Sequence, residues 1–133
     1  MYSDSEILTN RRIVIDYLKK PGLKKGIGAL RTGQGRCCLG HMCDALGYKS
    51  KRVDKEYVYD GATYELPFSI VDKLGMHVAD GEIDGHNLKF KNGHFGSLAA
   101  LNDESKIRPH EIGELLEPMI MGGDNTPWKK LRP

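Results

Sequence analysis

Glycine and proline interrupt this chain at short intervals, and their spacing limits what it can fold into. Among the 133 residues there are 16 glycines and 6 prolines. Proline cannot continue a helical hydrogen-bond ladder, and glycine supplies the positive φ angles that tight turns and helix ends require. The chain therefore divides into short elements, and no internal repeat or long linker separates them.

Length and composition predict a single compact domain over residues 1–133, with residues 122–133 forming a turn-rich tail. A hydrophobic content of 39% is enough for a core without metal ions or disulfides. The three cysteines are an odd number, and Cys37 and Cys38 are adjacent, which suits reduced thiols better than a secreted disulfide framework. Because there is no signal-peptide pattern and no apolar run of roughly 20 residues, we expect a soluble, cytoplasmic protein.

The charge balance limits the partners that the chain attracts at long range. Lysine and arginine together number 20, aspartate and glutamate 18, and the formal net charge is +2. So small a net charge argues against nonspecific binding to nucleic acid or to an anionic membrane. Any contact with an anion must therefore involve a local basic patch.

The hydrophobic periodicity predicts about five short helices. They are expected at residues 4–19, 39–46, 67–74, 95–102 and 109–118. The buried stripe of the first helix is expected to contain Ile7, Val14, Ile15 and Leu18. Arg11 and Arg12 are expected near the edge of that stripe, and Pro118 should kink or end the last helix.

Turn-forming pairs between the helices predict short antiparallel hairpins. The predicted turns are at residues 32–35, 60–61 and 92–93, with strands at 27–30 and 36–38, 57–59 and 62–64, and 88–90. Asp60-Gly61 is a preferred type I′ pair and gives the firmest of these predictions. The predicted fold is α+β, with helices at both ends packed around hairpins whose exposed edges could pair in a symmetric homodimer.

The tail contains the one tryptophan of the chain, Trp128, after the turn-rich run from Gly122 to Pro127. A free indole would leave a large apolar area in water. We therefore expect Trp128 to dock, either on this chain or on a partner.

The segment from Lys24 to Gly47 is where a functional site is expected to begin. Arg31 and Arg36 bracket Gly33 and Gly35, so bare backbone amides and flanking guanidinium groups could together bind a phosphate. The segment matches neither the Walker loop nor the G-x-G-x-x-G fingerprint. The competing interpretation, a solvated hairpin with two surface arginines, remains open.

A nucleophilic cysteine is a second possible chemistry. Cys38 lies near a predicted helix N-terminus, where the helix dipole favours a thiolate, and His41 is three residues further along the same helix. If the chain is an enzyme, Cys38 and His41 are the expected catalytic residues. The interpretation we prefer is that Cys37 and Cys38 are ordinary buried thiols and that no catalytic residue is present.

Two metal motifs were tested and neither fits. The spacing of Cys38 and Cys43, with His41 between them, has no second ligand pair as structural zinc sites require. The segment 80–85 resembles the start of a calcium loop, but Lys91 stands where a bidentate glutamate is needed. No metal and no cofactor are predicted.

Five motifs, GALRTG, RCCLGHMCDALG, LPFSIVDKLGM, SLAALND and EIGELLE, follow one another roughly between Gly26 and Glu117. In this combination the chain resembles a family of small uncharacterised proteins of bacteriophages and prophages. The resemblance implies an early or accessory phage protein that acts in the cytoplasm of the host bacterium, typically by binding rather than catalysis. Asn102 and Asp103 end the LAALND motif, where a structural cap is the first explanation and a polar site wall the second.

Three functions are compatible with these patterns, in order of preference. The first is a binding protein that sequesters an anionic, nucleotide-like molecule and so counters host antiviral defence, with Arg31, Gly33, Gly35, Arg36, Asn102 and Asp103 as ligand-binding residues. The second is a protein–protein inhibitor of a host defence enzyme, including an anti-CRISPR-like one. The third is a cysteine-dependent hydrolase.

Overall fold

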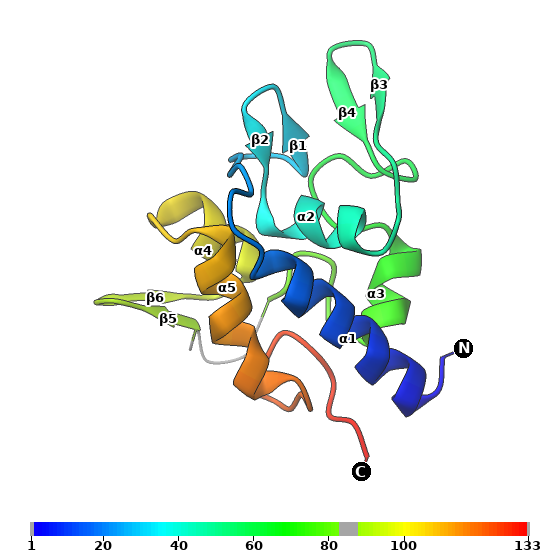
Figure 1. Ribbon diagram of the computed structural model, residues 1–133, viewed down its shortest axis with the longest axis vertical. Helices are drawn as coiled ribbons and strands as arrows, with labels where there is room; N and C mark the ends of the chain where they lie inside the picture. The colour runs from blue at the N-terminus through cyan, green and yellow to red at the C-terminus, as the bar shows by residue number, and fades with distance from the viewer. Residues whose placement is uncertain (1, 83–87, 133) are drawn as a thin grey trace.

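A computed structural model describes residues 2–82 and 88–132 and confirms the α+β fold. In this part of the chain five α-helices pack with three two-stranded antiparallel sheets (Figure 1). The helices are α1 (Asp4–Leu18), α2 (Cys38–Ala45), α3 (Phe68–Leu74), α4 (Leu98–Glu104) and α5 (Pro109–Leu116), followed by a 3₁₀ turn, η2 (Glu117–Met119). The strand pairs are β1 (Arg31–Thr32) with β2 (Gly35–Arg36), β3 (Lys51–Val53) with β4 (Glu56–Val58), and β5 (Leu88–Phe90) with β6 (Gly93–Phe95).

Helix α1 crosses the front of the molecule in Figure 1 and contributes to the core with one face. Val14, Ile15 and Leu18 are fully buried as predicted, whereas Ile7 is only half-buried. The expectation for Arg11 was wrong, because its side chain is fully buried rather than near the edge of the stripe.

Arg11 is buried because backbone carbonyls surround its guanidinium group. Nε donates to the carbonyl of Leu74 at 2.8 Å, and Nη2 donates to those of Gly75 at 3.2 Å and Lys129 at 2.8 Å. Nη1 donates to the carbonyl of Ile120 at 2.8 Å. The positive charge thus lies at the C-terminal end of α3, where the helix dipole favours a cation, and it joins α1, α3 and the tail.

Trp128 docks on this chain, which is one of the two predicted alternatives. The side chain is fully buried, and its indole Nε1 donates to the carbonyl of Met119 at 2.8 Å. The guanidinium carbon of Arg11 lies 5.0 Å from the centre of the Trp128 ring, within the range of a cation–π contact. The tail is therefore anchored by the same groups that bury Arg11.

The second hairpin differs from its prediction. The Asp60-Gly61 turn is present, with φ angles of 48° and 81° and a bridge between Tyr59 and Ala62. Beyond that bridge, however, strand β4 pairs with residues 51–53 and not with 63–64. The reason is a second tight turn at Asp54, whose φ of 57° lets the basic segment fold back on Tyr57.

Other helix and strand boundaries differ from the predicted ones by a few residues. The strand predicted at 27–30 was wrong, because Thr32 pairs with Gly35 in a tighter hairpin whose turn is Gly33-Gln34, and β1 therefore lies at Arg31–Thr32. Of the strand predicted at 36–38 only Arg36 belongs to β2, since Cys38 begins α2. The fourth helix begins later, since β6 continues to Phe95 and the Ser97 side chain caps α4 by accepting from a backbone amide at 3.0 Å. Helix α5 ends before Pro118 as predicted, and that proline lies in η2.

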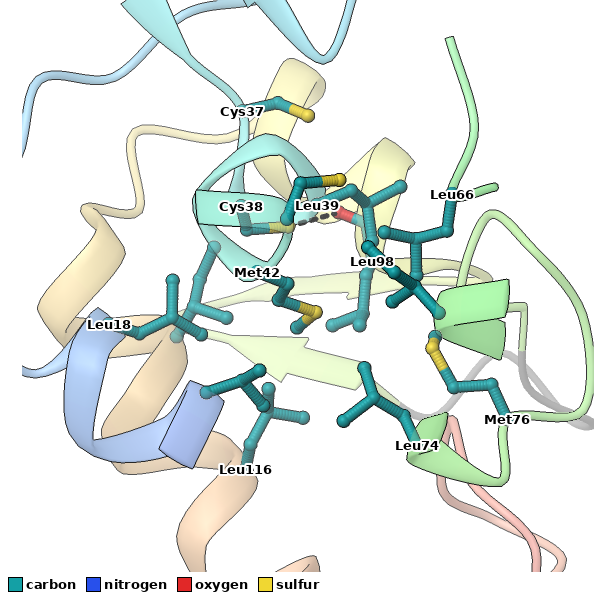
Figure 2. Packing of buried hydrophobic residues seen from close by; sticks show 14 of the residues in the cluster. Leu18, Cys37, Cys38, Leu39, Met42, Leu66, Leu74, Met76, Leu98 and Leu116 are labelled. Carbon is teal, nitrogen blue, oxygen red and sulfur yellow. Dashed lines mark hydrogen bonds between the residues drawn. The ribbon is translucent and has the colours of Figure 1, made fainter. Parts of the chain in front are cut away.

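The buried hydrophobic side chains form one cluster to which all five helices contribute (Figure 2). Outside it, the β1–β2 and β3–β4 hairpins project together from one end of the molecule, above α2 (Figure 1). The base of the first hairpin meets the loop that follows α1. This junction holds the residues that sequence analysis singled out.

Candidate functional site

A cleft of about 380 Å³ lies between the loop after α1, the β1–β2 hairpin and the first two turns of α2. Its polar lining comes from Tyr17, Lys24, Arg31, Thr32, Gln34, Arg36, His41 and Asp44. Its volume is at the lower end of the range of about 300–1,000 Å³ typical of small-molecule sites. The structure thus brings Arg31, Gly33, Gly35, Arg36 and His41 to one cavity.

The two glycines of the hairpin have different structural roles. A Cβ atom at Gly35 would lie 2.7 Å from the carbonyl oxygen of Lys24, so only glycine allows the hairpin to approach that loop. The approach is held by the amide of Arg36, which donates to Lys24 at 3.2 Å, and by the amide of Gly26, which donates to Arg36 at 2.8 Å. Gly33 at the tip has open space around it and is exposed. Gly35 therefore shapes the wall of the cleft, whereas Gly33 forms its rim.

Arg36 belongs to a polar network on the floor of the cleft. Its Nε donates to the hydroxyl of Tyr59 at 2.8 Å and forms an ion pair with Asp44. The Tyr59 hydroxyl in turn donates to Asp44 at 2.8 Å. Burial raises the pKa of Tyr59 to about 12, so its proton stays in place at neutral pH. Burial opposes the charge of Arg36, but the bonds to Tyr59 and the charge of Asp44 still hold its pKa above the ordinary value.

Arg31 has no carboxylate partner among the described residues. Its guanidinium carbon lies 4.1 Å from the centre of the Tyr57 ring on the neighbouring hairpin, and Nη1 donates to the hydroxyl of Ser50. The stacking and this hydrogen bond fix the guanidinium plane and leave its other N–H groups available. Of the two arginines, Arg31 is therefore the one whose charge is not neutralised.

His41 borders the cleft as a neutral, buried side chain. Only 3% of it is exposed, and Nε2 lies 2.8 Å from the carbonyl oxygen of Lys24. Because a carbonyl only accepts, Nε2 carries the proton and Nδ1 carries the lone pair. Nδ1 is buried and has no hydrogen-bond partner among the described residues. Burial lowers the pKa of His41, so the ring is uncharged at neutral pH.

Asn102 and Asp103 lie outside this cleft and support the segment that leads into it. Asn102 is fully buried; its Oδ1 accepts from the amide of Cys38 at 3.1 Å and its Nδ2 donates to the carbonyl of Gly26 at 2.9 Å. Asp103 accepts from the amide of Gly28 at 3.2 Å. This geometry is that of a cap on α2 and a brace for the loop, the first of the two explanations predicted for these residues.

The cysteines face the core. The Cys37 sulfur caps α2 by accepting from the amide of Gly40 at 3.4 Å, and burial raises the pKa of this thiol to about 11. Cys38 is fully buried, and its thiol donates to the carbonyl of Leu98 at 3.6 Å (Figure 2). Burial raises the pKa of Cys38 well above its ordinary range in spite of the nearby helix N-terminus. A hydrolase mechanism thus has no accessible thiolate at this position.

Within residues 2–82 and 88–132, no three histidine, cysteine, aspartate or glutamate side chains lie close enough together to hold a metal ion. The end of the calcium-like segment, residues 83–85, is outside the described residues. None of the helices described here is long and apolar enough to cross a membrane.

Comparisons with protein-family models, with curated proteins and with solved structures found no match to this chain. Sequence reasoning had missed Tyr17, Lys24 and Asp44, which also line the cleft. Asp44 lies within the RCCLGHMCDALG motif, which could have indicated it, whereas nothing local in the sequence connects Tyr17 to a hairpin.

Proposed function

We propose that the cleft binds an anionic, nucleotide-like small molecule and releases it unchanged. Three cationic side chains, Lys24, Arg31 and Arg36, line it together with a single carboxylate, that of Asp44. The observation that carries the proposal is Arg31, whose guanidinium group is oriented by Tyr57 without a neutralising partner among the described residues. A guanidinium group presented in this way is suited to bidentate binding of phosphate.

Two observations support binding without turnover: Cys38 does not line the cleft, and His41 borders it as a neutral side chain. Cys38 is buried and protonated, and His41 is neutral with its proton directed to a backbone carbonyl. Neither group supplies a nucleophile to a bound phosphate ester. The biological role we propose is that of a bacteriophage accessory protein that sequesters a nucleotide signal of host antiviral defence in the bacterial cytoplasm.

The test is to incubate the purified protein with ATP, ADP-ribose, cyclic di-AMP and cyclic di-GMP, remove the protein by filtration, and denature it. Chromatography of both fractions then shows what was retained. Sequestration predicts that at least one compound leaves the filtrate and returns intact on denaturation. A cleaved product would contradict the proposal and reopen the question of an enzyme.

The matched variants are Arg31→Ala and Arg52→Ala. Each variant removes one arginine that lies near the Tyr57 ring. The guanidinium carbon of Arg52 is 5.6 Å from the ring centre, but Arg52 is exposed on β3 and does not line the cleft. Arg31→Ala should weaken binding at least about tenfold, the effect of losing a charged hydrogen bond of about 1.5–3 kcal/mol, whereas Arg52→Ala should leave it unchanged. Equal ligand affinities of the two variants, measured by isothermal titration calorimetry, would contradict the assignment of Arg31 as a ligand-binding residue. Arg36→Ala is less informative, because it also breaks the network of Asp44 and Tyr59.

A protein target is the second candidate function, and one surface observation favours it. Phe68, the first residue of α3, is 85% exposed, and nearby in the chain Tyr64 is 62% exposed. Exposed aromatic side chains are common anchors of protein interfaces. If the protein retains none of the four compounds but captures a host protein, Phe68→Ser should release that protein and Arg31→Ala should not.

A further inference from the structure

A second cavity lies on the other side of the loop that follows α1. This cavity has a volume of about 700 Å³ and shares Gly22, Leu23, Lys24 and Gln34 with the cleft. Its far wall comes from the segment between α4 and α5, with Ser105, Lys106, Arg108 and Pro109. The two cavities are thus neighbours that share these four lining residues, and we call the second one the α5 lobe.

The α5 lobe is lined by four cationic side chains, Lys24, Lys25, Lys106 and Arg108, and by no carboxylate among the described residues. Two carboxylates on the flanking helices, those of Asp103 and Glu111, lie close enough for their charges to act on Lys25, but they do not line the cavity. Glu111 accepts from the amide of Arg108 at 3.0 Å, and Asp103 accepts from the amide of Gly28 at 3.2 Å. With a net charge of only +2 on the whole protein, this concentration of cations is a local feature.

Lys25 is held in place before any ligand arrives. Its ammonium group donates to the carbonyls of Ser105 and Ile107, both at 2.8 Å. An ammonium group has three donors, and the third has no partner among the described residues. Because the side chain is half-buried, ordering it for a ligand carries a smaller entropy penalty than ordering a free surface lysine.

The same lobe has an apolar wall. Leu23, Ile27 and Pro109 line it, and Ile27 is 56% exposed although it is a large aliphatic residue. A phosphate alone would use only the cations, whereas a nucleotide would also cover the apolar wall with its base. The chemistry of the α5 lobe therefore matches a second nucleotide unit better than an inorganic anion.

We propose that the cleft and the α5 lobe form one binding site for a dinucleotide, with one phosphate near Arg31 and Arg36 and the other near Lys25, Lys106 and Arg108. This inference rests on the proposed function and narrows it to ligands with two phosphates. Lys24 lines both cavities.

The experiment compares AMP and GMP with cyclic di-AMP and cyclic di-GMP by isothermal titration calorimetry on the full chain. The test variant is Lys106→Ala/Arg108→Ala, and the matched control is Lys130→Ala/Arg132→Ala. Both double variants remove one lysine and one arginine that are exposed, the control pair from the C-terminal tail outside both cavities. Circular dichroism checks that each variant remains folded.

The expected result is that a cyclic dinucleotide binds at least tenfold more tightly than the mononucleotide, and that only Lys106→Ala/Arg108→Ala removes this advantage. Equal affinities for the two ligand classes, or an advantage that survives in the test variant, would overturn the dinucleotide site while leaving the cleft intact. If neither class binds, the proposed function itself fails and this inference fails with it.

Discussion

Two regions of this protein bind arginine side chains in contrasting ways. Around Arg11 the protein surrounds a cation completely, with four carbonyl oxygens and one aromatic face, and leaves none of its surface in water. At the β1–β2 cleft, Arg31 and Arg36 are only half-buried, and a single carboxylate faces them.

The contrast separates a structural charge from one that is available to a ligand. The donors of Arg11 are used on the backbone of α3, η2 and the tail, so the charge stabilises the meeting of three segments. At the cleft, the Tyr57 ring and the Ser50 hydroxyl orient Arg31 but do not neutralise it. Arg11, whose donors are used on backbone carbonyls, therefore has a structural role, whereas Arg31 keeps donors that a ligand could use.

The largest predicted effect is on the Arg11 region. Arg11→Met should lower the free energy of unfolding by about 3–5 kcal/mol, because it leaves several buried carbonyls without donors. Arg12→Met on the same helix is the control; Arg12 is partly exposed and pairs with Glu117, a surface ion pair of at most about 1 kcal/mol. Chemical denaturation monitored by circular dichroism measures both. A loss below about 1 kcal/mol for Arg11→Met would mean that this cation does not hold the segments together.

A smaller effect is expected from two glycines on either side of the cleft. A Cβ atom at Gly40 would overlap the carbonyl oxygen of Leu30, so Gly40→Ala should cost about 1–3 kcal/mol through overpacking. Gly33 has nothing within 4 Å of the same position, and Gly33→Ala should change stability by less than about 0.5 kcal/mol. Thermal denaturation of both variants checks which substitution lowers the stability more. If Gly33→Ala proves the more harmful, the packing described for the hairpin is wrong.

The smallest effect concerns the protonation of His41. Its pKa in the folded protein is lowered by burial, so below a pH of about 6.5 the unfolded chain takes up a proton there that the folded protein does not. The free energy of unfolding should therefore fall as the pH drops below about 6.5, with a slope of at most about 1.4 kcal/mol per pH unit. His41→Gln retains a donor for Lys24 and removes the titration. The two stability curves should accordingly converge as the pH falls, and parallel curves between pH 7 and 5 would refute this assignment.

The sequence predicted the fold class and the helix positions, because these depend on local signals such as capping residues, apolar periodicity and turn pairs. It left open whether Trp128 docks on this chain or on a partner, which the contacts with Arg11 and Met119 decide. It failed at Arg11 and at strand β3, where contacts between segments far apart in the chain decide the outcome. At the candidate site, the glycines and arginines were grouped correctly into one hairpin. Asn102 and Asp103 were grouped with them in error as cleft residues, because a motif cannot show that Asn102 reaches back to cap α2.

The most direct test of the central claim is a map of which residues respond to a nucleotide ligand. Amide chemical shifts of the isotope-labelled protein would be followed by NMR during titration with cyclic di-AMP. We predict that the shifts concentrate at residues 22–26, 31–36 and 105–109, while the amides around Arg11 and Trp128 stay unchanged. Shifts confined to other surfaces, or none at millimolar ligand, would contradict the assignment of this cleft as the binding site.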